Sequence, residues 1–221
     1  MSQRSSDPFA PRRPPTQRRA RILVGAVRQA AREILKEEGP EGLTTNRVAD
    51  RAGVSVGSLY HYYPNKESIV SDLFEERVLE IAADIDRMSG AVPLETLPIE
   101  EALKRYAEMI LEHRKRLAGL HREFLEQWGT RFEVPRRTAP DGRTYFDITR
   151  GWLEVLIERN RERVEVTDVR AAATMLIILT DGFARAASEE RLPDLPETEL
   201  VSALTRSMLG SLNYQPGRKA V

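Results

Sequence analysis

Apolar residues recur every three or four positions along most of this 221-residue chain, and no stretch of useful length alternates polar and apolar residues as a half-buried strand does. The first example follows Thr16, a plausible helix N-cap, and its apolar pairs return every four residues: Ile22/Leu23, Ala26/Val27, Ala30/Ala31 and Ile34/Leu35. Gly39-Pro40 ends this helix, because proline cannot continue it. The periodicity predicts an all-α protein.

Capping residues divide the following segment into two short helices. Thr44 caps the first and Gly53 closes it, whereas Ser55 caps the second, which ends before Pro64. Residues 129–143 form the one long irregular loop that we expect. The longer helices are predicted at 66–88, 99–118, 120–128, 144–160, 167–190 and 197–213.

The composition excludes several classes of protein. The chain has no cysteine, so disulfides, thiolate catalysis and zinc sites built on cysteine are excluded. The longest strongly apolar run, Ala171 to Leu179, is too short to span a bilayer. The polar N-terminus, rich in proline and arginine, does not resemble a secretory signal. We therefore expect a cytoplasmic protein without a membrane partner.

Charge is distributed unevenly along a chain that is neutral as a whole. Residues 1–70 contain 12 Lys and Arg against 7 Asp and Glu, and the remainder contains 22 against 27. Most of the excess precedes Ile22, where six arginines face only Asp7. A basic end of this kind favours a polyanionic partner, and it is equally typical of a solvated tail.

The pentapeptide Gly53-Val54-Ser55-Val56-Gly57 matches the G-x-S-x-G nucleophile elbow of serine hydrolases. That elbow requires a strand entering the turn, whereas the residues before Gly53 have a helical pattern. We therefore interpret Ser55 as a helix N-cap and expect no catalytic residue; a serine hydrolase acting through Ser55 is the remote alternative. We also expect no metal site and no cofactor, since Gly119 interrupts the spacing of His113 and His121.

The same segment has the spacing of a helix-turn-helix. Ala49 is small enough to let two helices cross closely, Gly53 can adopt the left-handed turn conformation, and Leu59 can fasten the second helix to a core. In such motifs the second helix lies in the major groove of DNA, with its first residues at the base edges. The spacing therefore indicates a DNA-binding segment.

Residues 19–74 resemble the DNA-binding domain of the tetracycline-repressor (TetR) family of bacterial regulators. The resemblance is carried by R-I-L-V-G-A-V near the start and by E-G-L-T-T-N-R-V-A-D-R-A-G-V-S-V-G-S-L-Y-H-Y-Y-P-N-K-E-S-I-V. It implies an N-terminal three-helix helix-turn-helix domain followed by a C-terminal helical domain for ligand binding and dimerisation. The expected divisions are 1–17 as a disordered basic arm, 18–65 as the DNA-binding domain, 66–213 as the helical domain with 66–88 as the connecting helix, and 214–221 as a tail.

The resemblance also implies which residues meet the DNA. Tyr60 and Lys66 would bind phosphates, and Tyr63 would pack in the core. Val56 and Gly57 offer no side-chain hydrogen bond, so few side chains can read bases directly. The shape of the DNA should therefore contribute more to specificity. The full set expected at the DNA is Thr45, Asn46, Ser55, Val56, Gly57, Ser58, Tyr60, His61, Tyr62 and Lys66.

The C-terminal helices favour a homodimer. Residues 171–187 are apolar almost all round and rich in small side chains, and the next helix has an apolar stripe at i, i+4 spacing. Two such helices per chain would form a four-helix interface, unless both are buried within one chain. The expected dimerisation residues are Met175, Ile178, Leu179, Gly182, Leu200, Leu204, Met208 and Leu212.

Large side chains lie on the helices that the resemblance places around a ligand pocket. Such residues more often belong to a core than to a site. The candidates are Tyr106, Met109, His113, Phe124, Trp128, Trp152 and Phe183.

Taken together, these patterns predict a TetR-like homodimer that binds a palindromic operator in double-stranded DNA and leaves it when an unknown small molecule binds. The alternative is a DNA-binding protein of the same type that a protein partner controls, without a small-molecule inducer.

Overall fold

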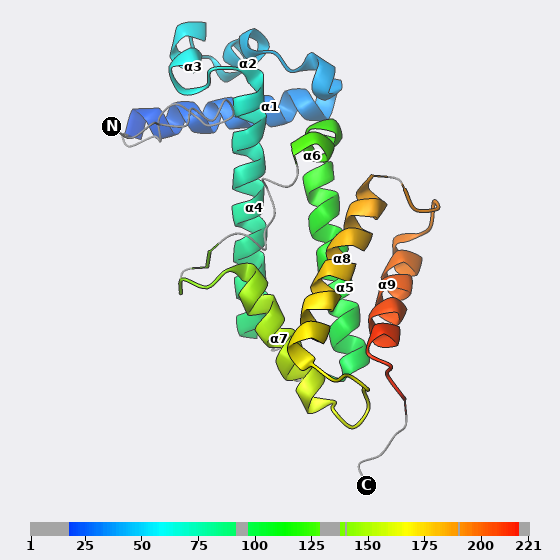
Figure 1. Cartoon of the computed structure of the whole chain (residues 1–221). Coiled ribbons are helices and arrows are strands. Elements are labelled where there is room, and N and C mark those ends of the chain that lie inside the picture. The colour runs from blue at the N-terminus through cyan, green and yellow to red at the C-terminus, as the bar shows by residue number, and fades with distance from the viewer. Residues whose placement is uncertain (1–17, 92–96, 129–137, 140, 190, 217–221) are drawn as a thin grey trace, which may run out of the picture. The chain divides into compact units, whose positions relative to one another are not determined.

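The computed structural model describes residues 18–91, 97–128, 138–139, 141–189 and 191–216. In the described residues the regular secondary structure is all helical, with no strand and only one isolated antiparallel bridge between Thr138 and Thr144. The all-α prediction is therefore confirmed. The helices are α1 (Arg18–Gly42), α2 (Thr45–Ala52), α3 (Val56–Tyr62), α4 (Lys66–Ala91), α5 (Ile99–Ala118), α6 (Arg122–Trp128), α7 (Tyr145–Arg159), α8 (Val169–Ser188) and α9 (Glu197–Ser211) (Figure 1).

Local capping chemistry explains where the first helices begin and end. Gly39, with φ of 71° and ψ of −174°, interrupts α1 just before Pro40, as the sequence predicts. Thr44 accepts a hydrogen bond from the backbone N–H of Arg47 at 3.3 Å and so caps α2. Asn65 caps α4, since its Oδ1 accepts from the backbone N–H of Ser68 at 2.8 Å.

The longer helices differ from the predicted ones mainly at their ends. α4 continues to Ala91, past the expected end at residue 88, so Gly90 lies within the helix. α6 begins at Arg122, because His121 precedes it and its Nδ1 accepts from the backbone N–H of Phe124 at 3.3 Å. α8 begins after Asp168, whose side chain accepts from the backbone N–H of Ala171.

The described residues divide into two compact units. The first contains the residues up to Val78 together with Leu117–Trp128, and the second contains Leu79–Arg116 with the described residues from Thr138 onward. In the first unit α2 packs against α1 and α3. The aromatic ring of Phe124, from α6, stacks on Phe74, from α4, with ring centroids 5.3 Å apart.

The second unit is built around one apolar core to which α5, α7, α8 and α9 contribute. Leu103, Leu153 and Leu204 are fully buried there. α8 packs against both α7 and α9. No helix in the described part of the chain is long and apolar enough to cross a membrane.

Candidate nucleic-acid interface

Two capping residues, Gly53 and Ser55, form the turn between α2 and α3. Gly53 adopts the left-handed conformation with φ of 66°, and its N–H donates to Asp50 O at 3.2 Å. Ser55 then begins α3 by accepting from the backbone N–H of Ser58 at 3.1 Å. Ala49 and Leu59 are fully buried, as the helix-turn-helix spacing requires. The predicted helices and their caps are confirmed here.

Ser55 has a structural role in this turn. The turn joins helix to helix, whereas a nucleophile elbow joins a strand to a helix. Its hydroxyl lies 2.7 Å from that of Ser58 and accepts from the Ser58 backbone N–H. In the described residues, no three His, Asp or Glu side chains are grouped to hold a metal ion.

Burying Ala49 and Leu59 turns the opposite side of α2 and α3 toward solvent. Thr45, Ser58 and Tyr62 are half-buried in this surface. The exposed members of the expected DNA-binding set are Asn46, Ser55, Val56, Gly57, Tyr60, His61 and Lys66. The structure thus brings the predicted residues of α2 and α3 to one accessible polar surface, which we call the α2–α3 surface.

A hydrogen bond between side chains links the two helices across this surface. The hydroxyl of Tyr60, on α3, lies 3.0 Å from Oγ1 of Thr45, the first residue of α2. The Tyr60 side chain is 42 % exposed, so its hydroxyl still reaches solvent. The two hydroxyls that are expected nearest the DNA backbone are therefore held together before DNA binds.

Arginines of α2 do not contribute to the α2–α3 surface as free cations. Arg47 forms an ion pair with Glu38, and Arg51 pairs with Glu37 at 2.9 Å and with Glu38 at 3.4 Å. The hydrogen bond with Glu37 raises the pKa of Arg51, so the pair stays charged. Both arginines of α2 are therefore paired with carboxylates of α1, and the sequence alone could not reveal these pairs.

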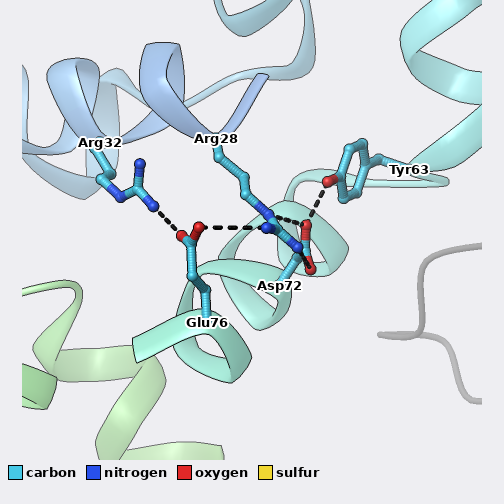
Figure 2. A network of polar contacts seen from close by, with 5 residues as sticks. All are labelled: Arg28, Arg32, Tyr63, Asp72 and Glu76. Carbon is cyan, nitrogen blue, oxygen red and sulfur yellow. Dashed lines mark hydrogen bonds and ion pairs between the residues drawn. The ribbon is translucent and has the colours of Figure 1, made fainter. Parts of the chain in front are cut away.

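A second polar cluster follows α3 and was not predicted from the sequence. Tyr63 is 1 % exposed, which confirms its place in the core, but its hydroxyl donates to Asp72 on α4. Arg28, on α1, binds the same carboxylate with two donors, and Glu76 and Arg32 extend the contacts (Figure 2). We call these five residues the α1–α4 network.

The family profile described as "Bacterial regulatory proteins, tetR family" matches residues 27–73, which span α2, α3 and every member of the α1–α4 network except Glu76. Over these residues, this protein belongs to the TetR family. It is a DNA-binding transcriptional regulator with an N-terminal helix-turn-helix and a C-terminal helical region.

Individual relatives of this TetR-family regulator resemble it over most of the chain. The fatty acid metabolism regulator protein of Bacillus subtilis is 28% identical over 153 residues, which are 66% of this chain and 74% of the relative. The nucleoid occlusion factor SlmA of Glaesserella parasuis is 27% identical over 162 residues, 73% of this chain and 74% of the relative. The solved structure of the transcriptional regulator FadR from Bacillus subtilis, in complex with stearoyl-CoA, shares the fold with a TM-score of 0.52 and 22% identity, covering 85% of this chain and 98% of that one.

The expected ligand residues of this TetR-family regulator do not all belong to one unit. Tyr106 and His113 are buried in the second unit, where Met109, Trp152 and Phe183 are half-buried. Phe124 instead lies in the first unit and uses its ring to stack on Phe74, so it is a packing residue of the helices beside the helix-turn-helix. The side chain of Trp128 lies outside the described residues.

Tyr106 and Trp152 form the polar part of the expected ligand set. Their rings are tilted, with centroids 5.3 Å apart. Thr180 donates to Ile177 O at 2.9 Å, so the hydroxyl of Tyr106, 3.3 Å from Thr180 Oγ1, must be the donor in that bond. Burial raises the pKa of Tyr106 to about 12 and keeps this proton in place. The indole N–H of Trp152 is buried without a hydrogen-bond partner among the described residues.

An open groove in the second unit lies away from these residues. It runs between the start of α5 and α9 and is lined by residues such as Glu100, Lys104 and Arg206. None of the expected ligand residues lines it. Its mixture of carboxylates and cations was not singled out from the sequence.

The expected dimerisation residues divide into an outward and an inward group. Met175 and Ile178 on α8 are 59 % and 57 % exposed, and Gly182 is exposed on the same helix, with Leu179 half-buried. On α9, Leu204, Met208 and Leu212 are buried in the core of their own chain. These three residues therefore face the core of their own chain, since a helical apolar stripe shows that a face is buried but not against what, and their role in a dimer stays a prediction. Leu200 is half-buried against the same core.

Proposed function

We propose that this TetR-family regulator is a homodimeric repressor that acts in the cytoplasm, binds a palindromic operator and leaves it when a small molecule binds. The observation that carries the proposal is the α2–α3 surface, on which the Tyr60–Thr45 hydrogen bond holds two helices in register. A second copy would place another α3 one turn of DNA away, so the operator would consist of two half-sites.

Roles at the DNA follow from the chemistry of the exposed groups. Tyr60 and Lys66 bind phosphates, because a phenol donates a hydrogen bond and an ammonium adds charge. Thr45 and Asn46 contact the backbone and a base. Ser58 and His61, together with Tyr62, read bases beside the small residues Ser55, Val56 and Gly57, and the sequence-dependent shape of the DNA supplies further specificity.

The dimer contact that we propose lies on α8. Met175 and Ile178, with Leu179 and Gly182 beside them, form an exposed apolar face that a second copy can cover. On α9, we assign Leu200 to the edge of this contact. The buried residues of α9 support the contact only indirectly, because they pack in the core of each chain. Removal of the apolar face should weaken association without unfolding the protein.

The ligand site that we propose lies beside Tyr106 and Trp152, with Met109, His113 and Phe183 near them. The buried indole N–H of Trp152 needs an acceptor, and a carbonyl-bearing ligand would supply one. A long-chain acyl-CoA is the first compound to test, because FadR is a relative whose structure contains stearoyl-CoA. The ligand would favour a spacing of the two α3 helices that does not fit the operator.

The deciding experiment is a selection of DNA sequences from a random pool, followed by a salt titration of the selected site. We expect an enriched palindrome with a steep negative salt slope, and loss of binding in Tyr60→Ala and Lys66→Ala. Lys104→Ala, an exposed lysine of the second unit, is the matched control and should bind as the unchanged protein does. A pool without any enriched sequence would contradict the proposal.

A second candidate is control by a protein partner without a small-molecule inducer. SlmA of Glaesserella parasuis, a nucleoid occlusion factor, covers this chain as extensively as the fatty acid regulator does. A thermal-shift series with acyl-CoAs of increasing length separates the two. Stabilisation that Trp152→Phe reduces supports the ligand-released repressor, whereas no stabilisation by any compound favours the partner-controlled protein.

A further inference from the structure

The recognition helix α3 is held by very few apolar contacts. It spans seven residues, and Leu59 is the only one of them that is buried. One apolar anchor fixes a position but not a direction, because the hydrophobic effect is not directional. The Tyr60–Thr45 hydrogen bond ties the middle of α3 to α2, and the next buried residue along the chain is Tyr63, which ends the helix and can fix its direction there.

Tyr63 is joined to α4 by a directional bond. Its hydroxyl donates to Oδ2 of Asp72, which is 8 % exposed and lies in the second turn of α4 (Figure 2). Burial raises the pKa of the Tyr63 hydroxyl, as does the neighbouring carboxylate, so the proton stays available for this bond. A hydrogen bond to a carboxylate is stronger than a neutral one and has a preferred geometry.

Asp72 is itself held rigidly from a third element. Arg28 donates from Nε to Oδ2 at 2.8 Å and from Nη2 to Oδ1 at 2.7 Å, which is the two-pronged geometry of an arginine–carboxylate pair. The hydrogen bond with Asp72 raises the pKa of Arg28, and the pair remains ionised. One turn further along α4, Glu76 binds Arg28 at 3.3 Å and also pairs with Arg32. Arg28 therefore braces the Asp72 carboxylate that Tyr63 reaches, and Arg32 braces the neighbouring Glu76 on α4.

The hydroxyl is not needed to fill the core, since phenylalanine would bury the same ring. We propose that Tyr63 and Asp72 are positioning residues, which set the direction of α3 for DNA recognition without contacting the DNA. Because Asp72 belongs to α4, a movement of the start of α4 would turn α3 with it. The inference rests on the proposed DNA-binding function and adds to it the residues that transmit a movement to the recognition helix.

Label distances test the positioning without any DNA. The chain has no cysteine, so Gln29→Cys and His61→Cys, both at exposed sites of the first unit, allow two spin labels to report the distance from α1 to α3. We expect Tyr63→Phe to broaden that distance distribution. The control is Tyr145→Phe, which removes the hydroxyl of another buried tyrosine in the second unit, and should leave it unchanged. An unchanged distribution in Tyr63→Phe would overturn the inference.

DNA binding provides the second readout. Tyr63→Phe should lower affinity for the selected operator about tenfold, the scale of one hydrogen bond to a charged group. Affinity for unrelated DNA at low salt should stay within about twofold, because that binding depends on charge alone. In an Asp72→Asn background the same change should have a smaller effect, because the two residues act as a pair.

The outcomes separate this inference from the function on which it rests. A lower unfolding midpoint with unchanged label distances and unchanged specificity would show a purely structural role and would overturn the positioning. Failure of the unchanged protein to enrich any DNA sequence would overturn the proposed function, while the label distances would still decide whether Tyr63 and Asp72 orient α3.

Discussion

The α2–α3 segment and the α8–α9 pair use apolar residues in opposite ways. In α2 and α3 only Val48, Ala49 and Leu59 are buried, and caps, one left-handed glycine and ion pairs complete the local structure. α8 and α9 bury whole apolar stripes, yet α8 also keeps Met175 and Ile178 exposed. The α2–α3 surface is thus held by a few directional contacts. The helical core instead depends on extensive burial, and one apolar face of α8 remains exposed.

The strongest test of this contrast compares α9 with α8. Leu204→Ala removes a fully buried side chain and should lower the free energy of unfolding by about 2–5 kcal/mol. Met175→Ala removes an exposed side chain and should cost well under about 1 kcal/mol in a monomer, but should weaken association of two copies. Denaturant titration and analytical ultracentrifugation measure the two effects. Equal losses of unfolding free energy would erase the distinction between an inward and an outward face.

Replacing glycines tests how strongly the backbone conformation of the α2–α3 turn is constrained. Gly53 has φ of 66°, a conformation that β-branched residues rarely adopt, so Gly53→Val should cost about 1–3 kcal/mol. Gly25 lies exposed within α1 with open space around its Cα, and Gly25→Ala should instead stabilise by about 0.5–1 kcal/mol. Denaturant unfolding of both variants measures the difference. A tolerated valine at residue 53 would mean that the turn is less constrained than its geometry indicates.

The cap of α3 provides a smaller effect. Ser55→Ala removes the acceptor of the Ser58 N–H and should cost about 1 kcal/mol. Ser207→Ala, in the exposed part of α9, should change the unfolding free energy by less than about 0.5 kcal/mol, because its hydroxyl only bonds a helix carbonyl. A fluorophosphonate probe should leave Ser55 unlabelled. Covalent labelling at Ser55 would revive the hydrolase interpretation.

The smallest expected effect is a pH dependence at α6. Burial lowers the pKa of His121 below 6.5, and its Nδ1 accepts the Phe124 N–H only when it is unprotonated. The stabilising contribution is complete above pH 6.5 and is lost as the pH falls through 6.5 toward the lowered value. His121→Asn, which keeps an acceptor, should therefore flatten the fall in stability on acidification. An unchanged pH profile in this variant would show that another group titrates there.

Most of the helices and the turn between α2 and α3 were predictable because their signals are local. Thr44, Gly53 and Ser55 act within four residues, and Ala49 and Leu59 repeat at helical spacing. The burial of the α9 stripe in its own chain could not be predicted, because Leu204 has the same periodicity whether it faces its own chain or a second one. Phe124 was assigned to a ligand pocket for a similar reason, since ring size does not reveal its stacking partner.

The long-range polar contacts could not be read from the order of residues at all. Arg28 and Asp72 are 44 positions apart, and nothing in either neighbourhood marks them as partners or marks the Tyr63 hydroxyl as the third member. The ion pairs of Arg47 and Arg51 with α1 likewise join residues that nothing in the sequence marks as partners. Helix limits, caps and the left-handed turn depend on bonds that close within about four residues and are encoded locally. The choice of partner for each apolar face and each charge depends on which distant residues the packed helices bring together, and only the tertiary structure decides that.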